Sequence, residues 1–148
     1  MQYSIVTGAT PNAAVVFLRA LHKGQGLSKS SQVLLLQLMT QTPTGLQRIK
    51  GLLPDGAVVA HKTGTSRTVY GVTAATNDLG LVTLPNGRHL AMPAAGYAGA
   101  VFISDSKADD ATREEVIAKV ASLALTHISC CLVKLNIEVL HCPHEYVR

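Results

Sequence analysis

The sequence has 148 residues, of which 47% are hydrophobic, and a formal net charge of +4 from 13 basic and 9 acidic residues. This length allows one domain with a hydrophobic core, and its longest apolar run, 33–39, is far shorter than the roughly 20 residues of a membrane span. The basic residues are scattered and only 4% of the residues are aromatic, so we expect no nucleic-acid interface, which needs clustered cations and stacking partners.

Two helices are expected in the first part of the chain. Thr10 is a good helix cap and proline suits the first helical position, which predicts a helix from Pro11 to about Lys23. Ser28 caps a second helix, in which residues 33–39 are apolar nearly all round, as in a helix packed on more than one side. A short helical turn over 45–53 follows and closes at a Pro-Asp-Gly turn.

Strands are expected after this turn. Residues 57–63 and 73–84 have the composition of strands, and the Asn-Gly pair at 86–87 predicts a hairpin turn. The segment 93–99 contains one proline and two glycines, which weaken a paired strand, and is expected to be an atypical insert. The returning strand is therefore expected in two pieces, 88–92 and 101–104.

The last helix is predicted over 110–125, and the composition changes after it. Residues 126–148 hold all three cysteines and are expected to form a tail unrelated to residues 1–125. The order of elements predicts an α/β fold of the α+β sandwich type. In this fold an antiparallel sheet of about three strands is flanked by N- and C-terminal helices.

Several strings in the sequence point to one family. TGLQRIKGLLPDGAVVAHKTGTS, TAATNDLGLVTLPNGR and VFISDS together resemble the C-terminal part of the class A serine β-lactamases, closest to their extended-spectrum branch. K-T-G is a signature of that class, with S-x-x-K and S-D-N. The resemblance covers roughly residues 2–125. It implies the C-terminal part of a β-lactamase/transpeptidase-like fold, a β-lactam as ligand, and no cofactor or metal ion.

The resemblance also implies roles for the K-T-G strand, which forms one wall of the substrate cleft in the family. The Lys62 ammonium would offer positive charge to the substrate carboxylate and to the hydroxyl of the S-D-N serine, and Thr63 would donate its hydroxyl to that carboxylate. Gly64, which lacks Cβ, would let the acyl group lie against the backbone. The backbone N–H of Thr65 would form half of the oxyanion hole.

Further positions match the family pattern. Arg48 would supply a second cation for the substrate carboxylate, unless it is a solvated helix arginine. Ser66 would line the edge of the cleft, unless it is an ordinary loop serine. Asn77, Asp78 and Gly80 match as well, and structural roles are expected for them.

Three elements of the family have no counterpart in this sequence: the nucleophilic serine of S-x-x-K, the S-D-N loop and the deacylating glutamate. One literal S-x-x-K, Ser104 to Lys107, lies at the predicted exit of a strand, where nothing holds Lys107 toward Ser104 as a catalytic base requires. We therefore predict a fragment that is inactive alone. Without the family's other elements, residues 101–103 would be an unprotected sheet edge and residues 33–39 would meet water, which predicts marginal folding or aggregation.

Three alternatives stay open. K-T-G also fits a penicillin-binding-protein-like acyltransferase fragment, although the NDLG-type strand favours the lactamases. The chain also fits a non-enzymatic remnant, or the half of a split enzyme that binds a complementary N-terminal half. A zinc site is the third, but its spacing departs from the usual pattern and a tail with incidental cysteines is favoured. Its ligands would be Cys130, Cys131, His141, Cys142 and His144.

Localisation is the last expectation from the sequence. The family acts in the periplasm or as secreted proteins. The N-terminus of this chain shows no signal-peptide pattern, so the chain as written is expected in the cytoplasm.

Overall fold

The computed structural model describes residues 9–85, 96–126, 134–135 and 137–139. The expected Asn-Gly turn, the strand piece 88–92, all three cysteines and most of the tail lie outside these ranges. Within the described ranges, no helix combines the length and apolar character needed to cross a membrane.

Two short helices open the described chain. Helix α1 spans Pro11–His22 and helix α2 spans Lys29–Thr40. The side chains of Thr10 and Ser28 accept hydrogen bonds from backbone N–H groups in the first turns of these helices, at 3.2 and 3.1 Å. Both caps were predicted from the sequence, and both satisfy N–H groups that have no partner inside the helix.

The sheet is antiparallel and has six strands in the described part of the chain, in the order β1-β3-β4-β6-β5, with β2 paired to β3. Three strands are long, as predicted: β1 Val58–Thr65, β3 Val72–Thr83 and β4 Gly96–Ser106. The others are β2 Thr68–Val69, β5 Lys134–Leu135 and β6 Ile137–Val139.

Residues 96–99, the end of the expected insert, form the start of β4 and pair with β3. A Cβ added at Gly96 would lie 2.6 Å from the Val82 carbonyl oxygen, so only glycine fits this close approach.

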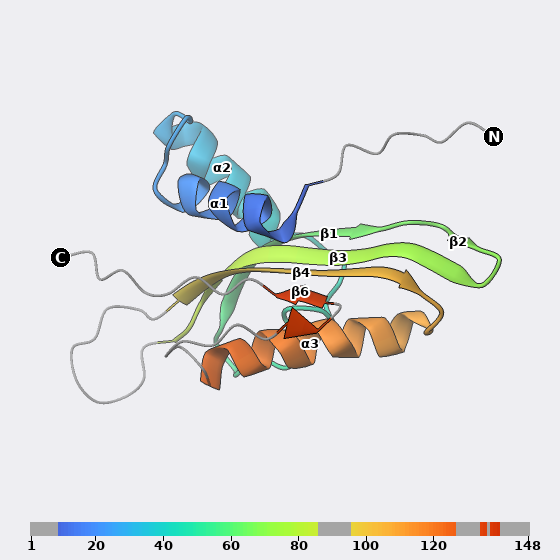
Figure 1. The fold of residues 1–148 in the computed structure, drawn as a ribbon. Helices are drawn as coiled ribbons and strands as arrows, with labels where there is room; N and C mark the ends of the chain where they lie inside the picture. The colour runs from blue at the N-terminus through green and yellow to red at the C-terminus, as the bar shows by residue number, and fades with distance from the viewer. Residues whose placement is uncertain (1–8, 86–95, 127–133, 136, 140–148) are drawn as a thin grey trace.

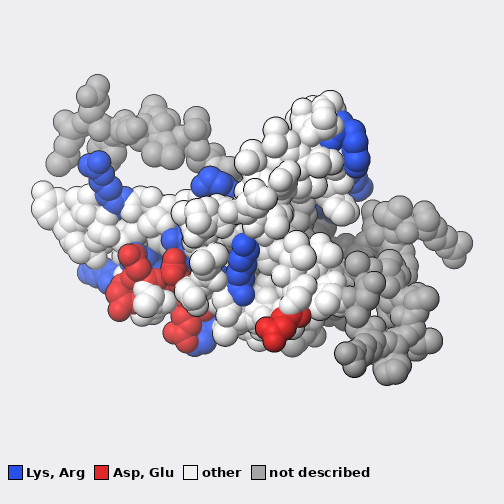
Figure 2. Space-filling model, turned by 180° about the vertical axis from the view of Figure 1, so that it is seen from behind, with Lys and Arg blue, Asp and Glu red and all other residues white. Residues whose placement is uncertain are grey.

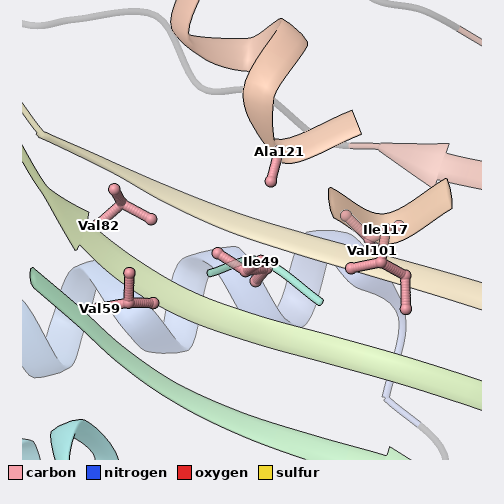
Figure 3. Packing of buried hydrophobic residues seen from close by; sticks show 6 residues of the cluster. All are labelled: Ile49, Val59, Val82, Val101, Ile117 and Ala121. Carbon is pink, nitrogen blue, oxygen red and sulfur yellow. The ribbon is translucent and has the colours of Figure 1, made fainter. Parts of the chain in front are cut away.

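Helices cover both faces of the sheet (Figure 1). Helices α1 and α2 lie on one face, and α3, Asp110–Thr126, lies on the other. Side chains alternate along β1, so that Val59 packs toward α3 and its neighbour Ala60 packs toward α1 and α2. The core on the α3 side is drawn in Figure 3 and consists of Ile49, Val59, Val82, Val101, Ile117 and Ala121.

The outer face of α1 and α2 carries apolar side chains that no described residue covers. Phe17 on α1 is 54% exposed, and Val33, Leu34 and Leu38 on α2 are each more than half exposed. The prediction that part of 33–39 meets water is therefore confirmed, while Met39 is buried against the sheet. Such a patch is typical of a surface that another part of a protein covers.

The edge of β4 is partly covered, which the sequence did not predict. Strand β6 pairs with it, placing Val139 opposite Val101 and Glu138 opposite Phe102. The expectation of an unprotected edge at 101–103 is wrong at these two positions. Apolar and polar residues alternate over 133–139, as is typical of a strand, but the pairing of this strand with β4 has no local signal in the sequence.

Charged side chains are dispersed over the face shown in Figure 2. Among the described residues on this face, basic side chains lie apart from one another, and several stand beside acidic ones.

Candidate functional site

The K-T-G segment forms the end of β1, at the outer edge of the sheet. Strand β1 pairs with β3 alone within the described residues, so its other edge is open. Lys62, Gly64 and Thr65 are exposed and Thr63 is half-buried. The Lys62 ammonium donates to the Thr63 carbonyl oxygen and remains accessible to solvent. A small molecule can therefore reach both the cation and the strand edge.

The orientation of the backbone at Thr65 follows from its neighbour. The Ser66 N–H donates to the Ala75 carbonyl oxygen at 2.9 Å, so it points toward the strand that follows β1 in the sheet. Successive N–H groups of an extended chain point to opposite sides. The Thr65 N–H therefore points to the open edge of the sheet.

The hydroxyl groups of Thr63 and Thr65 each contact a side chain from the segment that precedes β1. Thr63 Oγ1 lies 2.8 Å from Thr44 Oγ1, and Thr65 Oγ1 accepts a 2.7 Å hydrogen bond from Arg48 Nη2. Because Thr65 accepts this bond, its own hydroxyl hydrogen is available for a second acceptor.

Arg48 is buried, so the alternative that it is a solvated helix arginine is wrong. Only 7% of the residue is exposed. Besides Thr65, its guanidinium donates to the Asn77 carbonyl oxygen at 2.9 Å and to Glu114 Oε1 at 3.0 Å. Gly45, with φ of +66°, makes room for Arg48 and Thr63, because an added Cβ would lie 3.1 Å from Arg48 Cδ and 2.4 Å from Thr63 Cγ2. The positive charge is thus fixed directly behind the strand.

Ser66 is hydrogen-bonded to strand β3. Its hydroxyl oxygen accepts a 2.9 Å hydrogen bond from the Ala75 N–H, and it also donates to the Arg67 carbonyl oxygen at 3.3 Å. Ser66 therefore fixes the end of the K-T-G strand.

Two residues for which the sequence predicted no role in the site lie next to the K-T-G motif, one on β1 and one on β3. His61 and Asp78 are both fully buried, and His61 Nδ1 lies 2.9 Å from Asp78 Oδ2. The alternation of β1 carried a signal for this, because His61 shares the α3-side face with Val59. The structural role expected of Asp78 agrees with its burial.

The other sequence candidates gain no support from their geometry. Ser104 and Lys107 are both exposed and no hydrogen bond joins them. Among the described residues, no group of three His, Cys, Asp or Glu could hold a metal ion. The cysteines and histidines of the zinc alternative lie outside those residues.

Comparison with known proteins decides the family. A family model, Beta-lactamase2, described as the Beta-lactamase enzyme family, matches residues 5–128. The chain belongs to this family. It is 49% identical over 111 residues to the extended-spectrum β-lactamase PER-1 of Pseudomonas aeruginosa, covering 75% of this chain and 34% of PER-1. It is 40% identical to β-lactamase VEB-1 of the same organism, covering 78% of this chain and 37% of VEB-1.

Solved structures agree. The TLA-3 extended-spectrum β-lactamase superposes with a TM-score of 0.73 at 45% identity, covering 81% of this chain and 42% of that one. A class A β-lactamase from Bacteroides cellulosilyticus gives a TM-score of 0.68 at 34% identity, covering 78% of this chain and 39% of that one. The predicted class A resemblance and the α/β fold class are confirmed. The chain spans 34–37% of the length of PER-1 and VEB-1.

Proposed function

We propose that residues 62–65 are the substrate-binding strand of a class A β-lactamase, which hydrolyses the β-lactam amide through an acyl-serine intermediate. The observation that supports this most directly is the position of K-T-G at an open sheet edge, with Lys62 exposed and a buried Arg48 bound to Thr65. A β-lactam carries a carboxylate, and two cations beside a strand edge provide the complementary charge.

Each residue of the strand has a role in this proposal. The Lys62 ammonium attracts the substrate carboxylate, and the hydroxyl groups of Thr63 and Thr65 donate to it. The Thr65 N–H, directed to the open edge, stabilises the oxyanion of the tetrahedral intermediate. At Gly64 an added Cβ would meet nothing within 4 Å, so the space above the strand is free for the acyl group.

Arg48 and Ser66 support substrate binding indirectly, because they position the end of β1. Arg48 donates to the Thr65 hydroxyl oxygen, which leaves the hydroxyl hydrogen for the substrate. Ser66 fixes the end of β1 through its two bonds with Ala75. Both residues thus support binding of the carboxylate.

The 148 residues contain no family-type nucleophile, so we propose that this polypeptide binds a β-lactam weakly and does not turn it over. The test uses the full chain in two assays. Nitrocefin, a chromogenic β-lactam, should show no hydrolysis above the buffer blank. Benzylpenicillin, followed by ¹H–¹⁵N NMR, should shift the amide signals of residues 62–66.

The matched variants are Lys62→Ala and Lys107→Ala, which both remove an exposed lysine. Binding should be lost in the first and kept in the second. Shifts confined to other parts of the chain, or equal binding by both variants, would refute the role of the strand. Nitrocefin turnover by the purified wild-type chain would refute the proposed inactivity.

A further inference from the structure

We infer that His61 and Asp78 form a buried pair that positions the K-T-G strand against the turn that carries Arg48. The inference rests on the proposed function, because it assigns the pair a part in shaping the same substrate site. Neither residue touches the space in which a substrate would lie, since both are fully buried. They are positioning residues.

The contact between the two side chains is short and double. His61 Nδ1 lies 3.0 Å from Asp78 Oδ1 and 2.9 Å from Asp78 Oδ2. A carboxylate only accepts hydrogen bonds, so the imidazole carries a proton on Nδ1 and donates it. The ring orientation is therefore set by Asp78.

The same carboxylate holds a second segment of the chain. Asp78 Oδ2 also accepts a 3.2 Å hydrogen bond from the Ile49 backbone N–H. Ile49 directly follows Arg48, and His61 directly precedes Lys62. One buried carboxylate thus anchors the neighbours of both cations of the site, and so fixes the distance between the turn and the strand.

The surroundings strengthen this anchor. Ile49, Val59 and Val82 belong to the apolar core on this side of the sheet. A hydrogen bond is electrostatically stronger in such a low-dielectric interior than in water, and a buried polar group that loses its partner costs more. The pair should therefore hold a single geometry.

A glycine on the neighbouring strand β3 leaves space for His61. Gly80 pairs with His61 in the sheet, and a Cβ added there would lie 2.8 Å from His61 Cβ and 2.9 Å from the Ala60 carbonyl oxygen. Any side chain at this position would push His61 or the β1 backbone away. The glycine thus preserves the position of the pair.

The test compares full-chain variants that differ in one hydrogen-bond donor. His61→Leu removes the donor and keeps an apolar side chain, whereas His61→Asn keeps an N–H group near the position of Nδ1. Val82→Ala is the control, because it weakens the same core but lies four residues along β3 from Asp78 and pairs with Val59, before the K-T-G motif. Hydrogen exchange and ¹H–¹⁵N shifts of residues 62–66 report the positioning, and imidazole ¹⁵N shifts report the proton on Nδ1.

We expect His61→Leu to speed amide exchange at Lys62, Gly64 and Ser66, whose N–H groups face β3, about tenfold or more relative to β3 and β4, because the strand end opens locally. His61→Asn should restore most of the protection, and Val82→Ala should leave it unchanged relative to the rest of β3 and β4. The wild-type imidazole should show the proton on Nδ1. Unchanged exchange in His61→Leu, equal loosening in Val82→Ala, or a neutral ring protonated only on Nε2 would overturn the inference.

Benzylpenicillin binding separates this inference from the function on which it rests. If the wild-type chain binds, the dissociation constant should rise about tenfold in His61→Leu and stay close to wild type in His61→Asn. If the wild-type chain does not bind, the proposed function fails. The exchange and imidazole measurements then still decide whether the pair positions the strand.

Discussion

The Arg48 guanidinium joins the candidate site to the far side of the sheet, since it donates to the Thr65 hydroxyl at 2.7 Å and to Glu114 Oε1 at 3.0 Å. Glu114 lies on α3, which covers the face of the sheet opposite to α1 and α2. A buried cation needs such a partner, because desolvation of an unpaired charge is costly. Helix α3 therefore stabilises the buried cation of the candidate site through Glu114.

This relationship predicts unequal effects of two similar changes on α3. Glu114→Gln removes the negative charge beside buried Arg48 and should lower the free energy of unfolding by about 1–3 kcal/mol. Glu115→Gln breaks an ion pair with Lys119 in which both side chains are about 60% exposed, and should cost about 0–0.5 kcal/mol. Urea unfolding measures both values. Equal losses would contradict the role assigned to Glu114.

Replacement of two glycines by alanine should have different effects, on stability at one position and on ligand binding at the other. Gly80→Ala places a Cβ 2.8 Å from His61 Cβ and should destabilise the fold by about 1–3 kcal/mol through overpacking. Gly64→Ala meets no atom within 4 Å, so its stability should stay close to wild type while benzylpenicillin binding is lost. Thermal unfolding and NMR titration separate the two effects. A large loss of stability in Gly64→Ala would show that the space above the strand is not open.

Asp109 makes the start of α3 sensitive to acid. The Thr112 hydroxyl, and with it the Thr112 N–H, which donates to Asp109 Oδ1 at 2.8 Å, holds the pKa of Asp109 below its ordinary value of 3.8. A lowered folded-state pKa means that the stabilisation is complete above pH 3.8 and is lost as the pH falls through the folded-state pKa.

Asp109→Asn keeps the acceptor but not the charge. Its unfolding midpoint should therefore change less than that of wild type as the pH is lowered from about 5 toward 2. Urea unfolding across this range measures the difference. Asp55→Asn, a change in an exposed turn, serves as the control. Parallel pH profiles for wild type and Asp109→Asn would contradict the prediction.

Local signals in the sequence were enough to predict the helices and the long strands. Thr10 and Ser28 mark the helix starts because a cap depends on residues only three positions away. The start of β4 was missed, because its glycines suggested an interruption. In the structure Gly96 permits the close approach to Val82, which depends on strand register and cannot be read from composition.

The candidate site was predictable where it depends on a contiguous motif and not where it depends on tertiary contacts. Residues 62–65 were found through the family resemblance. The bond from Arg48 to Glu114 joins residues 66 positions apart, and that from His61 to Asp78 joins residues 17 apart. Such contacts are fixed by the register of β1 on β3 and by the docking of α3, for which this sequence alone has no local signal.

The pairing of β6 with β4 leads to a last prediction, on association. A proline in β6 cannot donate to a neighbouring strand, so Glu138→Pro should release β6 and expose the edge at Val101 and Phe102. Exposed edges pair with other chains, and the variant should form dimers and larger species at concentrations where wild type is monomeric. Light scattering after size exclusion measures the mass, and hydrogen exchange at Val101 and Phe102 measures the edge. Glu138→Ala, which keeps the backbone donor, should behave like wild type. If Glu138→Pro stays monomeric with unchanged exchange at both residues, β6 does not protect this edge.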